Sequence, residues 1–85
     1  MNKEFILSNL KEASEELQRT IRDIETDPAS FEFDELGAYD IAMRHLYYHL
    51  NTAWNAKKTS GEQVKNARDF DFHKWAQYPL DLEIL

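Results

Sequence analysis

The sequence predicts an all-α fold, a small three-helix bundle with an extended C-terminal strap. Apolar residues recur at intervals of three and four over two long stretches, which is the period of amphipathic helices. Proline occurs only twice, at Pro28 and Pro79, where it can end a helix. A chain of 85 residues with 42% hydrophobic residues can hold one core but is too short for two domains. We therefore expect a single helical domain over residues 1–85.

The first helix is expected over residues 2–26. Its apolar positions form a narrow stripe with polar residues elsewhere, as in a surface helix with one buried face. Asn2 can cap its start. Pro28 ends it, because proline lacks the amide donor and pushes the preceding residue out of the helical region. The residues of the stripe are Ile6, Leu10, Ala13, Leu17, Ile21 and Ile24.

The central helix, expected over residues 34–58, is the longest regular segment. At 100° per residue, its larger apolar side chains fall within an arc of about 120°. We expect this arc to be the main seam of the bundle, with Leu46 and Leu50 fully buried at its centre. Alanine at either position should then cost about 2 to 5 kcal/mol of stability. The residues of the arc are Leu36, Tyr39, Met43, Leu46, Tyr47, Leu50, Ala53 and Trp54.

The opposite face of the central helix is half apolar. Ile41, His45, Tyr48 and Thr52 are spaced one turn apart there, and a helix that is apolar on two sides usually has neighbours on both. We expect either the C-terminal strap or a second protein to cover this partner-binding strip. The simplest such protein is a second copy of the chain. A dimer of that kind should weaken as histidines become charged near pH ~6.5.

The third helix is expected to begin near Thr59 or Ser60, since Ser60 with Gln63 has the spacing of a capping box. Residues 69–72 alternate acidic and aromatic side chains like an extended segment. This alternation favours a break near residues 69–71, with helical segments over about residues 60–68 and 72–77. We expect Trp75 to pack back on the helical core.

The tail, residues 79–85, places apolar side chains at every second position. This pattern is typical of an extended segment. With no sheet to join, such a strap either lies in a groove between the helices or pairs with a partner.

Two histidines are the strongest candidates for chemistry. His45 and His49 lie four residues apart, so both rings could reach one divalent metal from the same helix face. A usable site needs a third ligand, either His73 or an acidic residue of the first helix, placed by tertiary packing. The competing interpretation is structural, with each imidazole bonded to a neighbouring carbonyl or carboxylate. No nucleophile elbow and no glycine-rich phosphate loop is present, so we expect neither catalysis nor a cofactor.

Charge and composition narrow the function classes. Sixteen acidic residues against ten basic ones give a formal charge of −6, which disfavours direct nucleic-acid binding. The chain has no cysteine, no membrane-length apolar run and no signal-like N-terminal segment, so a cytoplasmic protein is expected.

Three functional hypotheses remain. The leading one is an adaptor, regulator or inhibitor that binds another protein, a second copy of itself included. The alternative is a metal or small-ligand binding module centred on His45 and His49. The third is an acidic mimic of nucleic acid, supported only by the net charge.

Overall fold

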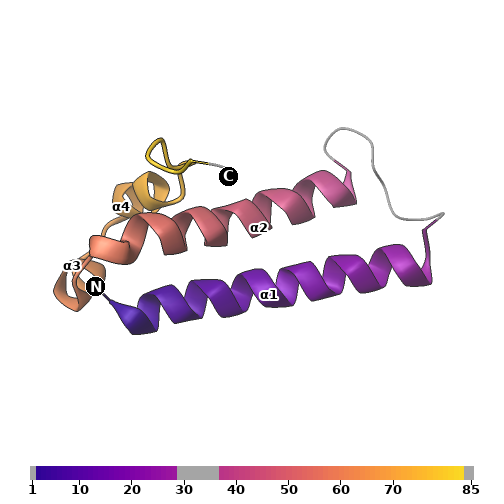
Figure 1. Cartoon of the computed structure of the whole chain (residues 1–85), viewed down its shortest axis with the longest axis horizontal. Coiled ribbons are helices and arrows are strands. Elements are labelled where there is room, and N and C mark those ends of the chain that lie inside the picture. The colour runs from indigo at the N-terminus through magenta and orange to yellow at the C-terminus, as the bar shows by residue number, and fades with distance from the viewer. Residues whose placement is uncertain (1, 29–36, 84–85) are drawn as a thin grey trace.

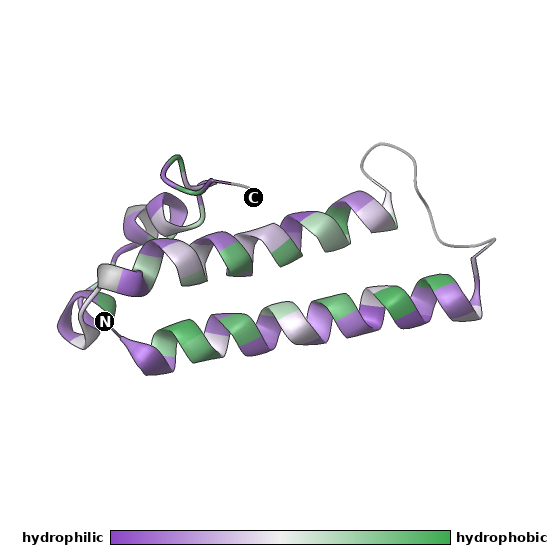
Figure 2. Ribbon diagram, in the orientation of Figure 1, coloured by the Kyte–Doolittle hydropathy of each residue, from purple (hydrophilic) through white to green (hydrophobic). Residues whose placement is uncertain are grey.

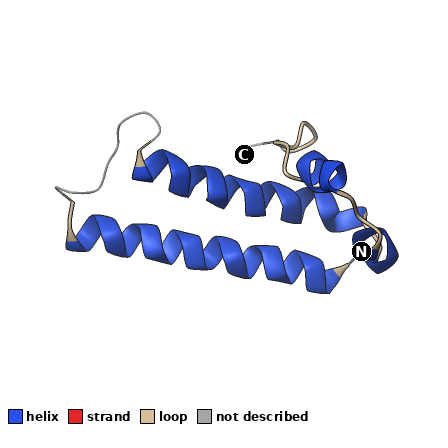
Figure 3. Cartoon of the chain, turned by 180° about the vertical axis from the view of Figure 1, so that it is seen from behind, coloured by secondary structure: helices blue, strands red, loops and turns tan. Residues whose placement is uncertain are grey.

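The computed structural model describes residues 2–28 and 37–83, and these are helical with turns and loops between the helices. Two long helices, α1 (Lys3–Thr26) and α2 (Ala38–Asn55), run antiparallel and side by side (Figure 1). The 3₁₀ turn η1 (Ala56–Lys58) and the short helices α3 (Gly61–Lys65) and α4 (Asp69–Trp75) follow. Figure 3 shows no strand in the described ranges. The all-α prediction is confirmed; residues 34–36 of the predicted central helix and 84–85 of the strap lie outside the described residues.

Helix α1 agrees with its prediction at both ends. Asn2 Oδ1 accepts a hydrogen bond from the backbone N–H of Phe5 at 3.0 Å, which satisfies one of the free donors at the helix start. At the other end, the N–H of Asp27 still reaches the carbonyl of Asp23 at 3.1 Å. Pro28 follows directly and stops the helix.

The contact between the long helices is made of small and polar side chains. On the long helices and η1, the buried apolar residues in the described part of the chain are the three alanines Ala13, Ala53 and Ala56. Thr20 and Thr52 are also buried, and each hydroxyl donates to a carbonyl four residues earlier, at 2.8 Å and 2.6 Å respectively. Small side chains let two helices approach closely, but they bury little apolar surface. The contact between the two long helices therefore provides only a small apolar core.

The predicted main seam is wrong in its degree of burial. Leu50 is 40% exposed and Leu46 is only half-buried. The buried residues of α2 are Thr52 and Ala53. Ala53 belongs to the predicted arc, but the larger members Tyr47 and Leu50 are exposed and lie beside the buried side of the helix. Figure 2 shows hydrophobic residues recurring along both long helices, and no long third helix covers them among the described residues.

The predicted partner-binding strip on the opposite face is not an open strip. Thr52 is only 1% exposed, and the His45 ring lies 3.8 Å from the carboxylate of Glu16 on α1. Ile41 and Tyr48 are exposed. This side of α2 therefore faces α1 in part. A hydropathy pattern does not predict such a contact, because the residues that make it are small and polar.

Helix α3 begins as the capping-box spacing predicts. Ser60 Oγ accepts from the N–H of Gln63 at 3.1 Å, and Gln63 Oε1 accepts from the N–H of Ser60 at 2.8 Å. The break, however, falls at 66–68, before the predicted 69–71. Asp71 Oδ2 accepts from the backbone N–H of Arg68 at 3.0 Å, so this carboxylate closes the first turn of α4. The acidic and aromatic alternation is thus helical.

Helix α4 packs on the end of the hairpin where α1 begins and α2 ends. The Trp75 ring lies edge-on to the Phe5 ring, with centroids 5.5 Å apart. The centroid of the Phe72 ring lies 6.4 Å from that of Phe5. The expectation that Trp75 packs back on the helices is confirmed. No helix within residues 2–28 and 37–83 is both long enough and apolar enough to cross a bilayer.

The tail departs from the predicted extended strap. Pro79 is buried, and the chain turns at Leu80 and Asp81 before Leu82. Because of this turn, Leu80 is fully exposed while Leu82 is half-buried, although period two would place them on the same side. Leu82 lies in a groove beside the helices, which was one of the two predicted positions for the tail.

Candidate functional site: an apolar groove

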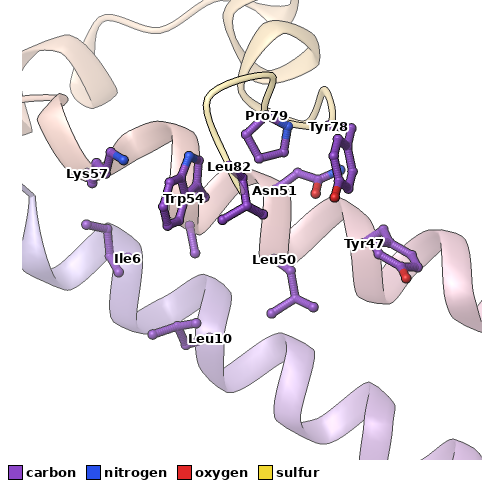
Figure 4. Close-up of a pocket in the computed structure, with 11 residues that line it drawn as sticks. Ile6, Leu10, Tyr47, Leu50, Asn51, Trp54, Lys57, Tyr78, Pro79 and Leu82 are labelled. Atoms are coloured by element: carbon purple, nitrogen blue, oxygen red, sulfur yellow. The ribbon is translucent and has the colours of Figure 1, made fainter. Parts of the chain in front are cut away.

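An apolar groove of about 610 Å³ lies where α1, α2 and the tail meet. Ile6 and Leu10 form the wall on α1, and Leu50 and Trp54 form the wall on α2. The third wall comes from the tail, through Tyr78, Pro79 and Leu82 (Figure 4). The volume is within the range of sites that hold a drug-sized ligand or an anchoring side chain.

Local sequence explains how each wall is placed. Ile6 and Leu10 are four residues apart on α1, as are Leu50 and Trp54 on α2, so each pair stands on one helix face. Pro79 cannot continue α4 and instead turns the chain back along α2. Leu82 is thereby brought next to Trp54, as Figure 4 shows.

A polar latch holds the tail at the rim of the groove. The indole N–H of Trp54 donates to Asp81 Oδ1 at 2.9 Å. Lys57 Nζ lies 3.6 Å from Asp81 Oδ2 and 3.6 Å from the centre of the Trp54 ring, a cation–π distance. The indole hydrogen bond lowers the pKa of Asp81, and the nearby Lys57 ammonium lowers it further.

Acid should release this latch. A carboxylate with a lowered folded-state pKa stabilises the docked tail above its unfolded value of about 3.9, and this contribution is lost as pH falls through the folded pKa. We expect the fluorescence of Trp54, measured in a Trp75→Phe background, to change with a midpoint below pH ~3.9. Asp81→Asn retains an acceptor oxygen but cannot titrate, so this acid transition should disappear. The same midpoint in Asp81→Asn would show that another group controls the signal.

The two candidate metal ligands contact different partners on α1. Asn9 donates its side-chain amide to the carbonyl of Phe5 at 3.0 Å, which leaves its Oδ1 facing His49 Nδ1 at 3.0 Å. The Nδ1 atom of His49 therefore carries the hydrogen. His45 Nδ1 lies 3.8 Å from Glu16, whose carboxylate also binds Arg19 at 2.7 Å. In the described ranges, no three His, Cys, Asp or Glu side chains are grouped to hold a metal.

The acidic side chains on α1 do not form an uninterrupted row. Glu4 and Glu15 share the outer face of this helix with Lys11 and Arg22, and all four are exposed. A mimic of nucleic acid would need regularly spaced negative charge, as along a phosphate backbone. We therefore do not propose that function.

Sequence reasoning found the residues of the groove but assigned them another role. Leu10 was expected on the buried stripe of the first helix, and Leu50 and Trp54 were expected in the main seam of the central helix. The tail that contains Leu82 was expected in a groove or on a partner. The contact between Trp54 and Asp81 was missed. These residues are 27 positions apart, and no local pattern connects them.

Comparisons of the chain with protein-family models, with curated proteins and with solved structures found no match. The function is therefore argued from the groove and the surfaces beside it.

Proposed function

We propose that this protein acts by binding another protein, as an adaptor, regulator or inhibitor, without chemistry of its own. The apolar groove is the contact surface. We place this activity in the cytoplasm, and the lack of cysteine in the 85-residue chain fits a reducing compartment.

The observation that carries the proposal is the exposure of large apolar side chains around the groove. Leu10, Tyr47, Leu50 and Tyr78 all line it and are all exposed, while the buried apolar residues of α1, α2 and η1 in the described chain are alanines. Contiguous apolar surface of this kind marks interaction sites in proteins that are otherwise polar. Tyrosine and tryptophan, both present here, are also enriched among residues that dominate binding energy.

The shape and charge of the site indicate the kind of segment it would take. A groove between two helices suits the apolar face of an amphipathic helix, whose anchors recur at three- and four-residue spacing. The net charge of −6 favours a partner with basic residues around those anchors, because long-range attraction speeds association. We therefore expect an amphipathic, basic partner segment.

A matched pair of leucines on α1 tests the proposal. Leu10 lines the groove and is 44% exposed, whereas Leu7 lies outside it and is 51% exposed. A partner captured from the native host should be purified and its affinity measured by calorimetry. Leu10→Glu should weaken binding by roughly 10-fold or more, since the charge would be buried without a partner.

Leu7→Glu introduces the same charge on the same helix and should leave the affinity within about 2-fold of the original, because it stays in solvent. Circular dichroism must show equal helicity for both variants. Equal loss of affinity in the two variants would place the binding surface outside the groove, and no loss in either would reject the proposal.

A further inference from the structure

The groove is one end of a longer apolar strip along the hairpin. On α1, Leu10, Leu17 and Ile21 are separated by seven and four residues, so they share one helix face. All three are exposed. Leu10 lines the groove, and Leu17 and Ile21 follow it about two and three turns further along α1. On α2, Leu50 borders the same strip and is also exposed.

We propose that a second copy of this chain covers the strip, so that two hairpins form a symmetric four-helix dimer. This inference rests on the proposed protein-binding function. The partner it names is a second copy of the acidic chain, in place of the basic segment that the net charge alone favours. The interface differs from the strip predicted through Ile41 and Thr52, since it lies on the side of Leu10 and Leu50.

The size of the strip approaches what a stable dimer needs. Helix α1 has 24 residues and is about 36 Å long at ~1.5 Å per residue. Two adjacent helices are roughly 20 Å wide, since each has a diameter of about 10 Å. Because α2 has 18 residues and is about 27 Å long, the two-helix face covers on the order of 600 Å², somewhat below the ~800 Å² that each partner buries in a standard interface.

A second hairpin suits this surface better than a single peptide segment. The groove near the tail could hold one short helix, but Leu17 and Ile21 lie outside its lining. A copy of the chain carries an apolar strip of the same length on the same pair of helices. Pairing the two strips also supplies the large apolar core that three buried alanines do not provide.

Charge predicts how the dimer responds to salt. Each copy carries a formal charge of −6, so two copies repel one another at long range. The residues that line the groove include Lys57 and no acidic side chain, so at this end of the contact the repulsion comes from residues outside the groove. Raising the salt concentration should screen this repulsion and tighten the dimer.

Sedimentation of the full chain over a range of concentrations tests the proposal with a matched pair of isoleucines. Ile21 on the strip is 48% exposed, and Ile41 on the opposite flank of α2 is 50% exposed. Glutamate at either position gives the same net charge. We expect the unmodified chain to dimerise and Ile21→Glu to raise the dissociation constant by roughly 100-fold or more, because the twofold axis buries the charge twice. Ile41→Glu should remain as dimeric as the unmodified chain.

Helicity by circular dichroism checks that the variants fold, and Leu17→Gln provides a milder change at a second exposed position of the strip. It should also weaken the dimer. A monomer at every concentration would overturn the proposal, as would a dimer that resists both strip variants or one that only Ile41→Glu dissociates. A monomer whose captured partner is lost on Leu10→Glu would reject the homodimer and leave the proposed function in place.

Discussion

Leucine in place of Ala13 or Ala56 should destabilise the protein by about 1 to 3 kcal/mol in each case, because neither position has room for a larger side chain. Ala56 is fully buried in η1, which contacts α1, and Ala13 is buried where α1 faces α2. Added methyl groups must push the helices apart. Urea unfolding followed by circular dichroism measures the loss, which is a large fraction of the stability of a small domain.

Ser8→Leu is the matched control for this experiment. Ser8 is exposed on α1, so a leucine there adds the same apolar volume without meeting a neighbouring helix. Its effect should stay within about 0.5 kcal/mol. If Ala13→Leu and Ala56→Leu were equally harmless, the helices would have to be farther apart than the structure shows.

Loss of the amide group of Asn55 should detach α4 from α2. This amide donates to the carbonyl of Trp75 at 2.6 Å and to that of Gln77 at 2.7 Å. One turn earlier, Asn51 donates to the carbonyl of Ala76 at 2.9 Å. Carbonyls at a helix end have no partner within the helix, so two side chains of α2 satisfy the end of α4.

We expect Asn55→Ala to cost about 1 to 3 kcal/mol, because the Trp75 carbonyl is partly buried and would lose its donor. Asn55→Asp should cost more, since a carboxylate of the same shape would face two carbonyl oxygens. Urea unfolding measures the loss of stability, and the rate of proteolysis after residue 75 measures the detachment of α4. Asn66→Asp, at an exposed position in the loop before α4, should change neither. An aspartate less disruptive than alanine at position 55 would contradict the hydrogen bonds described.

The first helix was predictable because its determinants are local. Asn2 and Pro28 act on their nearest neighbours, and the apolar stripe has a single period. The start of α4 was not predictable in the same way, since the alternation around Asp71 fits both an extended segment and an acidic first helical turn. Besides the local cap between Asp71 and Arg68, the contacts of Phe72 and Trp75 with Phe5, about 70 residues away in sequence, favour the helix.

The burial of α2 could not be predicted from hydropathy. Its apolar side chains occupy most of its circumference, and a periodic pattern marks the larger ones, such as Leu50, as the inner face. The residues buried at this end of the hairpin are instead Thr52, Ala53 and Ala56, whose small size matters more than their hydrophobicity. The same error explains why the groove was interpreted as a filled seam.

The pairing of Asn9 with His49 determines which turn of α1 lies beside which turn of α2. An interface of alanine and threonine has few large side chains that interlock, so it would tolerate sliding by one helical turn. Asn9 is buried, and a shift of about 5.4 Å would leave its carbonyl oxygen and the His49 N–H without each other. This buried polar contact thus favours one alignment of the hairpin over its neighbours, as a buried asparagine does in coiled coils. Replacing both Asn9 and His49 by leucine should allow several alignments of α1 against α2 with similar energy.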